Sequence, residues 1–143
     1  MPRRVPDLDA WIAASRERAL LRVLGIVGHD LGEGWCEYRI AVTPASSDGR
    51  GSVSSFATTV AADMGVLVAA TSTVDTDFEE NSGTAELNMT YIEPSEGELV
   101  VRSEVAAVAR TMRIVVVSVR DARGVLVASG RGTYAVRQKS RAE

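Results

Sequence analysis

Residues 54–71 read Ser-Ser-Phe-Ala-Thr-Thr-Val-Ala-Ala-Asp-Met-Gly-Val-Leu-Val-Ala-Ala-Thr, and this stretch decides the fold. It follows a run of small, turn-forming residues at 44–51. A helix is therefore predicted to begin near Ser54 or Ser55, either of which can cap it, and to continue to about Thr71. Because nearly all of its residues are apolar or small, we expect this long helix at the centre of the fold.

Asp63 is the one residue of this stretch that departs from the packing of a core helix. At about 100° per residue it shares a narrow stripe with three hydrophobic residues, which are Phe56, Val60 and Leu67. We therefore expect the Asp63 carboxylate to be partly buried, which is unfavourable without a partner. The sequence has no Lys or Arg from residue 51 to residue 101, so the partner is a distant side chain, a backbone donor, another subunit or a substrate. A functional carboxylate and a hydrogen-bonded structural one both fit this pattern.

The flanking sequence indicates an α+β fold. Before the central stretch, a helix is predicted over residues 7–24 and a half-buried strand over 35–43. After it, the acidic residues 73–83 are expected to form a solvated loop, and four more strands are predicted at 84–91, 98–109, 112–120 and 125–136. We therefore expect one domain over 1–143 with about five strands, a core over about 25–136 and a frayed tail at 137–143.

Composition excludes several classes of protein. The 143 residues carry a formal net charge of -3, whereas modules that bind DNA tightly are usually basic. The single cysteine, Cys36, excludes an intrachain disulfide, and the single histidine, His29, leaves no His/Cys cluster for a structural zinc ion. The most apolar stretch, 56–74, is interrupted by Asp63, and no apolar secretory segment follows the first residues. We expect a cytoplasmic protein with no metal and with neither nucleic acid nor membrane as a partner.

Several common catalytic motifs are absent from the sequence. It contains no Gly-x-Ser-x-Gly, phosphate-binding glycine loop, His-Glu-x-x-His or Gly-x-Gly-x-x-Gly motif. Cys36 falls on the apolar side of its predicted strand, where a small buried hydrophobe is expected rather than a nucleophile.

Three stretches carry a family resemblance. They are Val-Ala-Ala-Asp-Met-Gly at 60–65, Thr-Ala-Glu-Leu-Asn-Met-Thr-Tyr-Ile-Glu-Pro at 84–94 and Val-Ala-Ser-Gly-Arg-Gly-Thr-Tyr at 127–134. Together with the order of elements, they resemble the hotdog-fold acyl-CoA thioesterases of the PaaI type, from phenylacetic acid degradation. The resemblance runs from about residue 21 to residue 136. It implies a curved antiparallel sheet wrapped around the long helix, and hydrolysis of an apolar acyl- or aryl-CoA thioester.

The resemblance also implies roles for three residues. Asp63 matches the catalytic carboxylate, which activates water or attacks the thioester directly. The backbone N–H of Ser55, at the N-terminus of the helix, would polarise the thioester carbonyl. Thr84 matches a Ser or Thr that orients the water or the carboxylate from a strand of the neighbouring subunit, although an ordinary strand threonine is the alternative.

The sequence departs from the family pattern just before Asp63. The family usually has an Asn, then a Gly, then His-Gly-Gly, and this chain has Asp48, Gly51, Ser54, Ser55 and Phe56 at these positions. The main-chain donor at Ser55 is retained. However, Phe56 narrows the approach of a ligand to the backbone, and Asp48 accepts hydrogen bonds where Asn could also donate them.

The resemblance implies a homodimer, or a homotetramer made of two such dimers, with Asp63 of one subunit facing Ser55 of the other. The coenzyme A thioester is the substrate, and no cofactor is expected. Arg110 and Arg113, at the loop that joins two predicted strands, are candidates for binding the phosphates of coenzyme A, with solvated loop arginines as the alternative. Two other functions remain open. One is a non-catalytic or weakly active hotdog protein that binds acyl-CoA or a related ligand, and the other is a structural dimer whose Asp63 is simply hydrogen-bonded.

Overall fold

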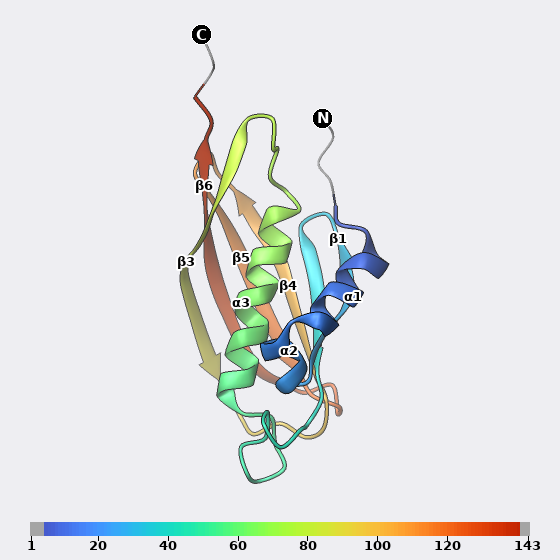
Figure 1. Cartoon of the computed structure of the whole chain (residues 1–143). Helices are drawn as coiled ribbons and strands as arrows, with labels where there is room; N and C mark the ends of the chain where they lie inside the picture. The colour runs from blue at the N-terminus through green and yellow to red at the C-terminus, as the bar shows by residue number, and fades with distance from the viewer. Residues whose placement is uncertain (1–4, 141–143) are drawn as a thin grey trace.

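The computed structural model describes residues 5–140. Six strands form one antiparallel sheet in the order β1-β2-β4-β5-β6-β3 (Figure 1). The strands are β1 (Ile26–Gly32), β2 (Trp35–Ile40), β3 (Glu79–Tyr91), β4 (Leu99–Val108), β5 (Met112–Arg120) and β6 (Leu126–Gln138). The helices are α1 (Leu8–Glu17), α2 (Ala19–Val23) and α3 (Ser55–Thr71). Within the described residues, no helix combines the length and the apolar character needed to cross a membrane.

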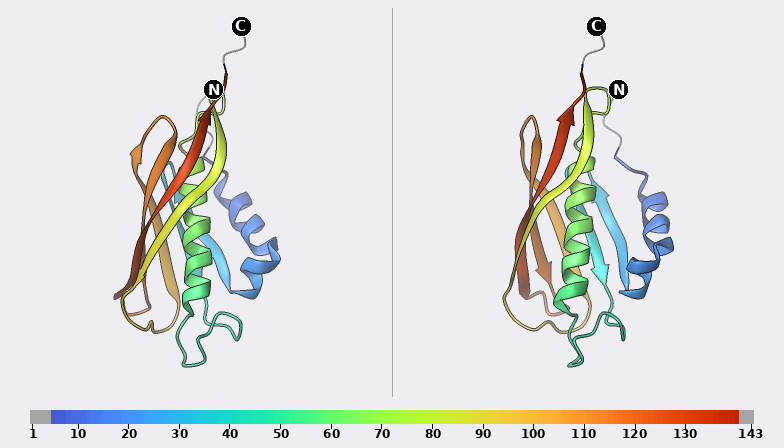
Figure 2. Two further views of the ribbon diagram at one scale, coloured as in Figure 1. Left: turned by 90° about the vertical axis from the view of Figure 1, so that its left-hand side faces the viewer. Right: turned by 60° about the vertical axis from the view of Figure 1, so that its left-hand side comes forward.

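The sheet curves around α3, which lies along its concave face (Figure 2). The side of α3 that faces the sheet consists largely of small residues, among them the buried Ala57, Ala61, Gly65 and Ala69. A Cβ atom added at Gly65 would collide with Ser103 Oγ on β4. Small side chains at these positions therefore bring the helix close to the sheet.

The opposite side of α3 carries Phe56 and Leu67 together with Asp63. Phe56 is 79% exposed, Leu67 is 37% exposed, and Asp63 between them is also exposed. The predicted partial burial of Asp63 is therefore wrong for the single chain. Because the small residues of α3, together with Val66 and Val68, are the ones buried against the rest of the fold, Asp63, Phe56 and Leu67 face outward.

The helix predicted over residues 7–24 is divided in two. Arg18 has extended backbone (φ -68°, ψ 117°) and separates α1 from α2. α1 lies beside β1, where the hydroxyl of Ser15 accepts a hydrogen bond from the Gly28 N–H at 3.0 Å. α1 thus covers backbone of β1 at one edge of the sheet.

The sheet has one strand more than the predicted number of about five. The additional strand is β1, whose sequence Ile-Val-Gly-His-Asp-Leu-Gly lacks the regular alternation of a half-buried strand. Its pairing with β2 also shifts register between Gly28 and Asp30. β2 ends at Ile40, three residues before the predicted end.

β3 begins at Glu79, within the stretch that was predicted to be a solvated loop. Its first residues pair with β6, and their carboxylates have cationic partners: Glu79 with Arg113 and Glu80 with Arg137, each at 2.7 Å. The predicted frayed tail therefore begins too early, because Arg137 and Gln138 still belong to β6. Residues 141–143 of the predicted tail lie outside the described part of the chain.

Asp121 holds together two turns near the start of α3. Its Oδ1 accepts hydrogen bonds from the N–H groups of Arg123 (2.9 Å) and Val125 (3.3 Å), and its Oδ2 accepts from the Glu96 N–H (3.0 Å) and the Arg123 guanidinium (2.7 Å). Chiefly through the Arg123 side chain, these bonds lower the pKa of the Asp121 carboxyl from 3.8 to about 2, although desolvation acts in the opposite direction. The ionised carboxylate is therefore the form that the folded chain favours.

We expect the stabilising effect of Asp121 to depend on pH. The pKa of the carboxyl is lower in the folded chain than in the unfolded chain, so its contribution is complete above about pH 4 and is lost as the pH falls from about 4 to about 2. Urea unfolding from pH 7 to pH 3 should show Asp121→Asn less stable than wild type, by a gap that narrows toward pH 3. Asp9→Asn, at an exposed position of α1, is the control. A gap that does not change with pH would contradict this role.

Candidate functional site

The first turn of α3 presents free backbone donors. Ser54 is the N-cap residue, and its Oγ accepts from the Ala57 N–H at 3.2 Å. Among residues 5–140, the N–H groups of Ser55 and Phe56 have no hydrogen-bond acceptor. These donors lie at the positive end of the helix dipole, where a developing oxyanion would be stabilised.

A groove of about 600 Å³ lies between α3 and β3 and contains Asp63, and we call it the α3–β3 groove. The residues that line it are Phe56, Thr59, Val60, Asp63, Thr84, Ala85, Glu86 and Leu87. Within the described chain the Asp63 carboxylate has no hydrogen bond or ion pair, so it is available to a ligand or to water. The resemblance implied that Thr84 comes from the neighbouring subunit, but Asp63 and Thr84 already line one groove of the same chain.

A second hollow of about 350 Å³ also adjoins the first turn of α3, and we call it the loop pocket. Ser55 and Tyr91 line it together with residues of the neighbouring loops and strands, among them Asp48, Val53, Ile92, Leu99 and Val127. Ser55 is therefore next to the loop pocket, whereas Asp63 is in the α3–β3 groove.

The loop before α3 is fixed by its own backbone. Asp48 lines the loop pocket, but its Oδ1 accepts from the N–H groups of Arg50 (2.7 Å) and Ser52 (3.2 Å). Gly51 has a φ of 89°, in the region that favours glycine, and it lies in open surroundings. Both residues therefore maintain the turn that leads to Ser54.

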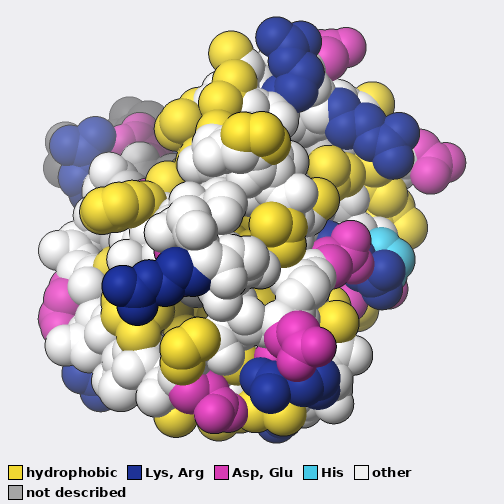
Figure 3. All heavy atoms as spheres, turned by 90° about the horizontal axis from the view of Figure 1, so that it is seen from below, with side chains coloured by type: hydrophobic (Ala, Val, Ile, Leu, Met, Phe, Trp, Pro, Cys, Tyr) yellow, Lys and Arg dark blue, Asp and Glu magenta, His cyan; other side chains and the backbone are white. Residues whose placement is uncertain are grey.

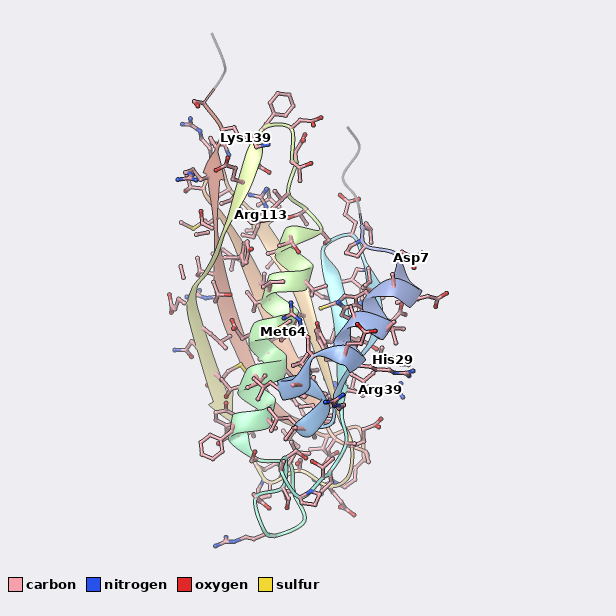
Figure 4. All side chains as sticks on the ribbon, in the orientation of Figure 1. Asp7, His29, Arg39, Met64, Arg113 and Lys139 are labelled. Atoms are coloured by element: carbon pink, nitrogen blue, oxygen red, sulfur yellow. The ribbon has the colours of Figure 1, made fainter. Side chains whose placement is uncertain are left out.

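Arg113 is a structural residue, and its predicted contact with coenzyme A phosphates is wrong. Only 1% of its side chain is exposed, and its guanidinium donates to Glu79 Oε2 (2.7 Å), Thr73 Oγ1 (2.9 Å) and the Ala109 carbonyl (2.8 Å). Two longer bonds occupy its remaining N–H groups. Figure 4 shows Arg113 beside the C-terminal end of α3, opposite to the end that carries Ser55.

Arg110 belongs to the turn that leads to Arg113. Its backbone carbonyl accepts from Gln138 Nε2 at 2.6 Å, and its side chain is exposed. Since α3 has 17 residues, this turn lies roughly 25 Å from the first turn of α3 within one chain. Arg110 therefore does not approach the free donors of its own subunit.

Charge at the N-terminal end of α3 is dispersed. Figure 3 shows this end of the molecule, where Lys and Arg side chains are scattered among hydrophobic and uncharged groups and do not form one continuous basic patch. The described residues 5–140 of a single chain thus present no concentrated basic surface for a polyphosphate on this face.

Sequence reasoning missed Tyr91, the last residue of β3. Its hydroxyl donates to the Ser55 carbonyl at 3.2 Å and is also hydrogen-bonded to Thr59 Oγ1. The alternation of residues 84–91 placed Tyr91 on the same face as Leu87 and Met89, so its orientation was visible in the pattern. Its polar contact was not, because the pattern does not reveal which part of α3 lies opposite.

Cys36 is buried beneath α3, as expected from its strand position. Its thiol donates to the Gly65 carbonyl at 3.4 Å, and burial raises its pKa to about 12. The thiol therefore stays neutral and is not a nucleophile. The described residues also contain no group of three or more metal-binding His, Cys, Asp or Glu side chains.

Solved structures with the same architecture include several thioesterases. A thioesterase from Haemophilus influenzae aligns with a TM-score of 0.83 and 16% identity, over 95% of this chain and 94% of that chain. A mutant thioesterase from Pseudomonas aeruginosa aligns with a TM-score of 0.82 and 20% identity, over 96% and 98%. The PaaI protein of the Escherichia coli phenylacetic acid degradation operon aligns with a TM-score of 0.72 and 17% identity, over 90% and 89%.

Neither a protein-family profile nor a curated protein sequence matches the chain. At these identities the structural likeness shows the fold alone. The predicted hotdog architecture is thereby confirmed, with six strands in the sheet.

Proposed function

We propose that this chain, which has the fold of hotdog thioesterases, hydrolyses the thioester of an apolar acyl- or aryl-CoA. The observation that carries the proposal is the α3–β3 groove, where the unpaired Asp63 carboxylate and the Thr84 hydroxyl lie along the helix whose first turn has free N–H donors. The solved structures with this fold that are named thioesterases support the same reaction.

In the proposed reaction a water oxygen adds to the thioester carbonyl carbon while Asp63 takes up the proton. The Ser55 N–H donates to the carbonyl oxygen as it becomes an oxyanion, and Thr84 orients the water. The tetrahedral intermediate then releases the thiolate of coenzyme A, which is protonated by Asp63. In the alternative mechanism, the Asp63 carboxylate attacks the thioester carbonyl carbon directly, the C–S bond breaks, and coenzyme A leaves as the thiolate. Asp63 and the acyl group are then joined as a mixed anhydride, which water hydrolyses to the free acid, and the proton released in this step goes to the thiolate. The Ser55 N–H and Thr84 have the same roles in both mechanisms.

The helix geometry supports a site shared between two subunits. Ser55 and Asp63 are eight residues apart in α3, which at about 1.5 Å per residue separates them by about 12 Å along the axis. Groups so far apart cannot both contact one thioester carbonyl, since each must be within about 3 Å of the reacting atoms. We therefore assign Asp63 and Thr84 to one chain and the Ser55 N–H to its partner.

The proposed homodimer forms through β3 and the outward face of α3. β3 is the last strand in the sheet order and pairs only with β6 in the described chain, so its other edge is free to pair. Next to it, Phe56 and Leu67 expose an apolar surface. Pairing of two β3 edges would cover this surface with the partner's α3, and two such dimers give the tetramer.

We expect Phe56→Glu to weaken the dimer. Phe56 makes few contacts in the single chain but lies on the proposed interface, where loss of a central aromatic side chain raises the dissociation constant by at least about 30-fold. Sedimentation equilibrium measures this constant. Phe78→Glu is the matched control, because Phe78 is 63% exposed but precedes β3 and lies outside both hollows. Equal dissociation constants for Phe56→Glu and wild type would contradict the interface.

A non-catalytic acyl-CoA-binding protein is the second candidate. It is favoured by the Phe56 side chain, which stands at the groove and limits how closely a thioester approaches the backbone. Release of free thiol from short, medium, long and aryl acyl-CoAs separates the two functions. Turnover supports the hydrolase, and tight binding without turnover supports the second candidate.

A further inference from the structure

Tyr91 connects β3 to the first turn of α3 by hydrogen bonds. The Thr59 hydroxyl donates to the Ser55 carbonyl at 2.7 Å, so the Tyr91 hydroxyl is the donor in its bond to Thr59 Oγ1. The single Tyr91 proton is shared with the Ser55 carbonyl, which lies 3.2 Å from the Tyr91 hydroxyl oxygen. Figure 1 shows the end of β3 beside the beginning of α3, in agreement with these contacts. The two hydroxyls thus converge on the carbonyl of the peptide unit between Ser55 and Phe56, which directly follows the unit that carries the Ser55 N–H.

These are the only hydrogen bonds between α3 and β3 in the described part of the chain. Elsewhere, Val60 of α3 and Leu87 of β3 line the same groove and are partly buried against the core. Apolar contacts are not directional, whereas hydrogen bonds fix distance and angle. The Tyr91 hydroxyl is therefore the directional contact between this end of β3 and α3.

The position of this link relates it to the proposed site. Thr59 lines the α3–β3 groove with Asp63 and Thr84, and Tyr91 lines the loop pocket with Ser55. The hydrogen-bonded hydroxyls of Tyr91 and Thr59 thus lie between the two hollows, at the first turn of α3. No part of this arrangement requires Tyr91 itself to contact the thioester.

We propose that Tyr91, through Thr59, is a positioning residue that holds the Ser55 N–H in the orientation needed to bind the oxyanion. This proposal rests on the proposed function, and it adds the residue that holds the backbone N–H donor of Ser55 in place. An error of about 1 Å in such a group reduces the rate by about 100-fold, so even partial loosening of the turn is measurable.

The test is Tyr91→Phe, which removes the hydroxyl and keeps the ring. Tyr91 is 45% exposed, so the melting temperature should change little. We expect kcat to fall about 10-fold while KM stays within about 2-fold, because the donor acts mainly on the transition state. Thr59→Val should give a similar loss, and the double variant should be no worse than either single variant, because the two hydroxyls act as one unit. Thr90→Val, which removes a neighbouring β3 hydroxyl, is the control.

A second measurement separates this proposal from the proposed function. The ¹⁵N order parameters of the Ser55 and Phe56 amides should fall in Tyr91→Phe from about 0.85 toward 0.6, and should stay unchanged in Thr90→Val. If wild type hydrolyses no thioester, the proposed function fails, and the order parameters alone decide whether Tyr91 fixes the turn. Unchanged order parameters, or a kcat within about 2-fold of wild type in an active enzyme, would overturn the positioning role.

Discussion

Asp63→Asn is expected to lose about 1,000-fold in kcat for thioester hydrolysis while acyl-CoA still binds. The amide has nearly the shape of the carboxylate but neither takes up a proton from water nor attacks the carbonyl. Because Asp63 is exposed and has no internal partner in residues 5–140, the substitution removes no contact of the folded chain. Loss of activity would then reflect chemistry and not unfolding.

Steady-state thiol release and calorimetric titration with acyl-CoA measure the two effects of Asp63→Asn. Asp9→Asn, at an exposed position of α1 outside both hollows, is the matched control and should keep wild-type rates. Turnover by Asp63→Asn within about 10-fold of wild type would exclude Asp63 as base or nucleophile.

Ser55→Pro is expected to lower kcat by about 100- to 1,000-fold, the usual effect of removing one oxyanion donor. Proline lacks the backbone N–H and is well tolerated at the first position of a helix. The preceding residue, Ser54, already has the extended backbone (φ -65°, ψ 156°) that a following proline requires. The substitution thus removes the proposed donor with little change to α3.

Ser55→Ala separates the backbone donor from the side chain. It retains the N–H and removes only an exposed hydroxyl, so its kcat should remain within about 3-fold of wild type. Circular dichroism of both variants checks that α3 is intact. If alanine and proline reduce kcat equally, the hydroxyl and not the N–H is the functional group.

The sequence predicted α3 well because several local signals agree there. Small turn residues precede it, a serine caps it, and its composition is apolar for nearly five turns. The same periodicity identified the stripe that contains Asp63, but periodicity does not say which side of a helix meets the sheet. The buried small residues Ala57, Ala61 and Gly65 mark the side that meets the sheet, and at Gly65 a larger side chain would collide with Ser103.

Non-local interactions explain why the sequence analysis missed β1 and misassigned Arg113. β1 is held by pairing with β2 and by the cover of α1, so its glycine-rich sequence does not need strand alternation. Arg113 is read from sequence as a loop arginine, yet Glu79, from a strand that is distant in sequence, compensates its charge in the interior. Such pairs depend on the tertiary fold and leave no local pattern.

Only part of the candidate site could be predicted, because some of its contacts are non-local as well. Asp63 and Thr84 emerged as candidates from the helix stripe and the family resemblance, and the structure brings them to one groove. The role of Asp48 in its own turn and the contact of Tyr91 with the first turn of α3 depend on distances that only the fold supplies.

The central claim is that Asp63 of one chain and the Ser55 N–H of its partner form one hydrolytic site. Subunit mixing tests this claim most directly. Chains that carry Asp63→Asn and chains that carry Ser55→Pro are unfolded in urea, mixed in equal amounts and refolded together, and the release of thiol from acyl-CoA is measured. Half of the dimers should then contain both chains, and each of these has one site with both groups intact. The account predicts that two inactive parents yield roughly a quarter of wild-type activity. Activity no greater than that of the separately refolded parents would contradict it.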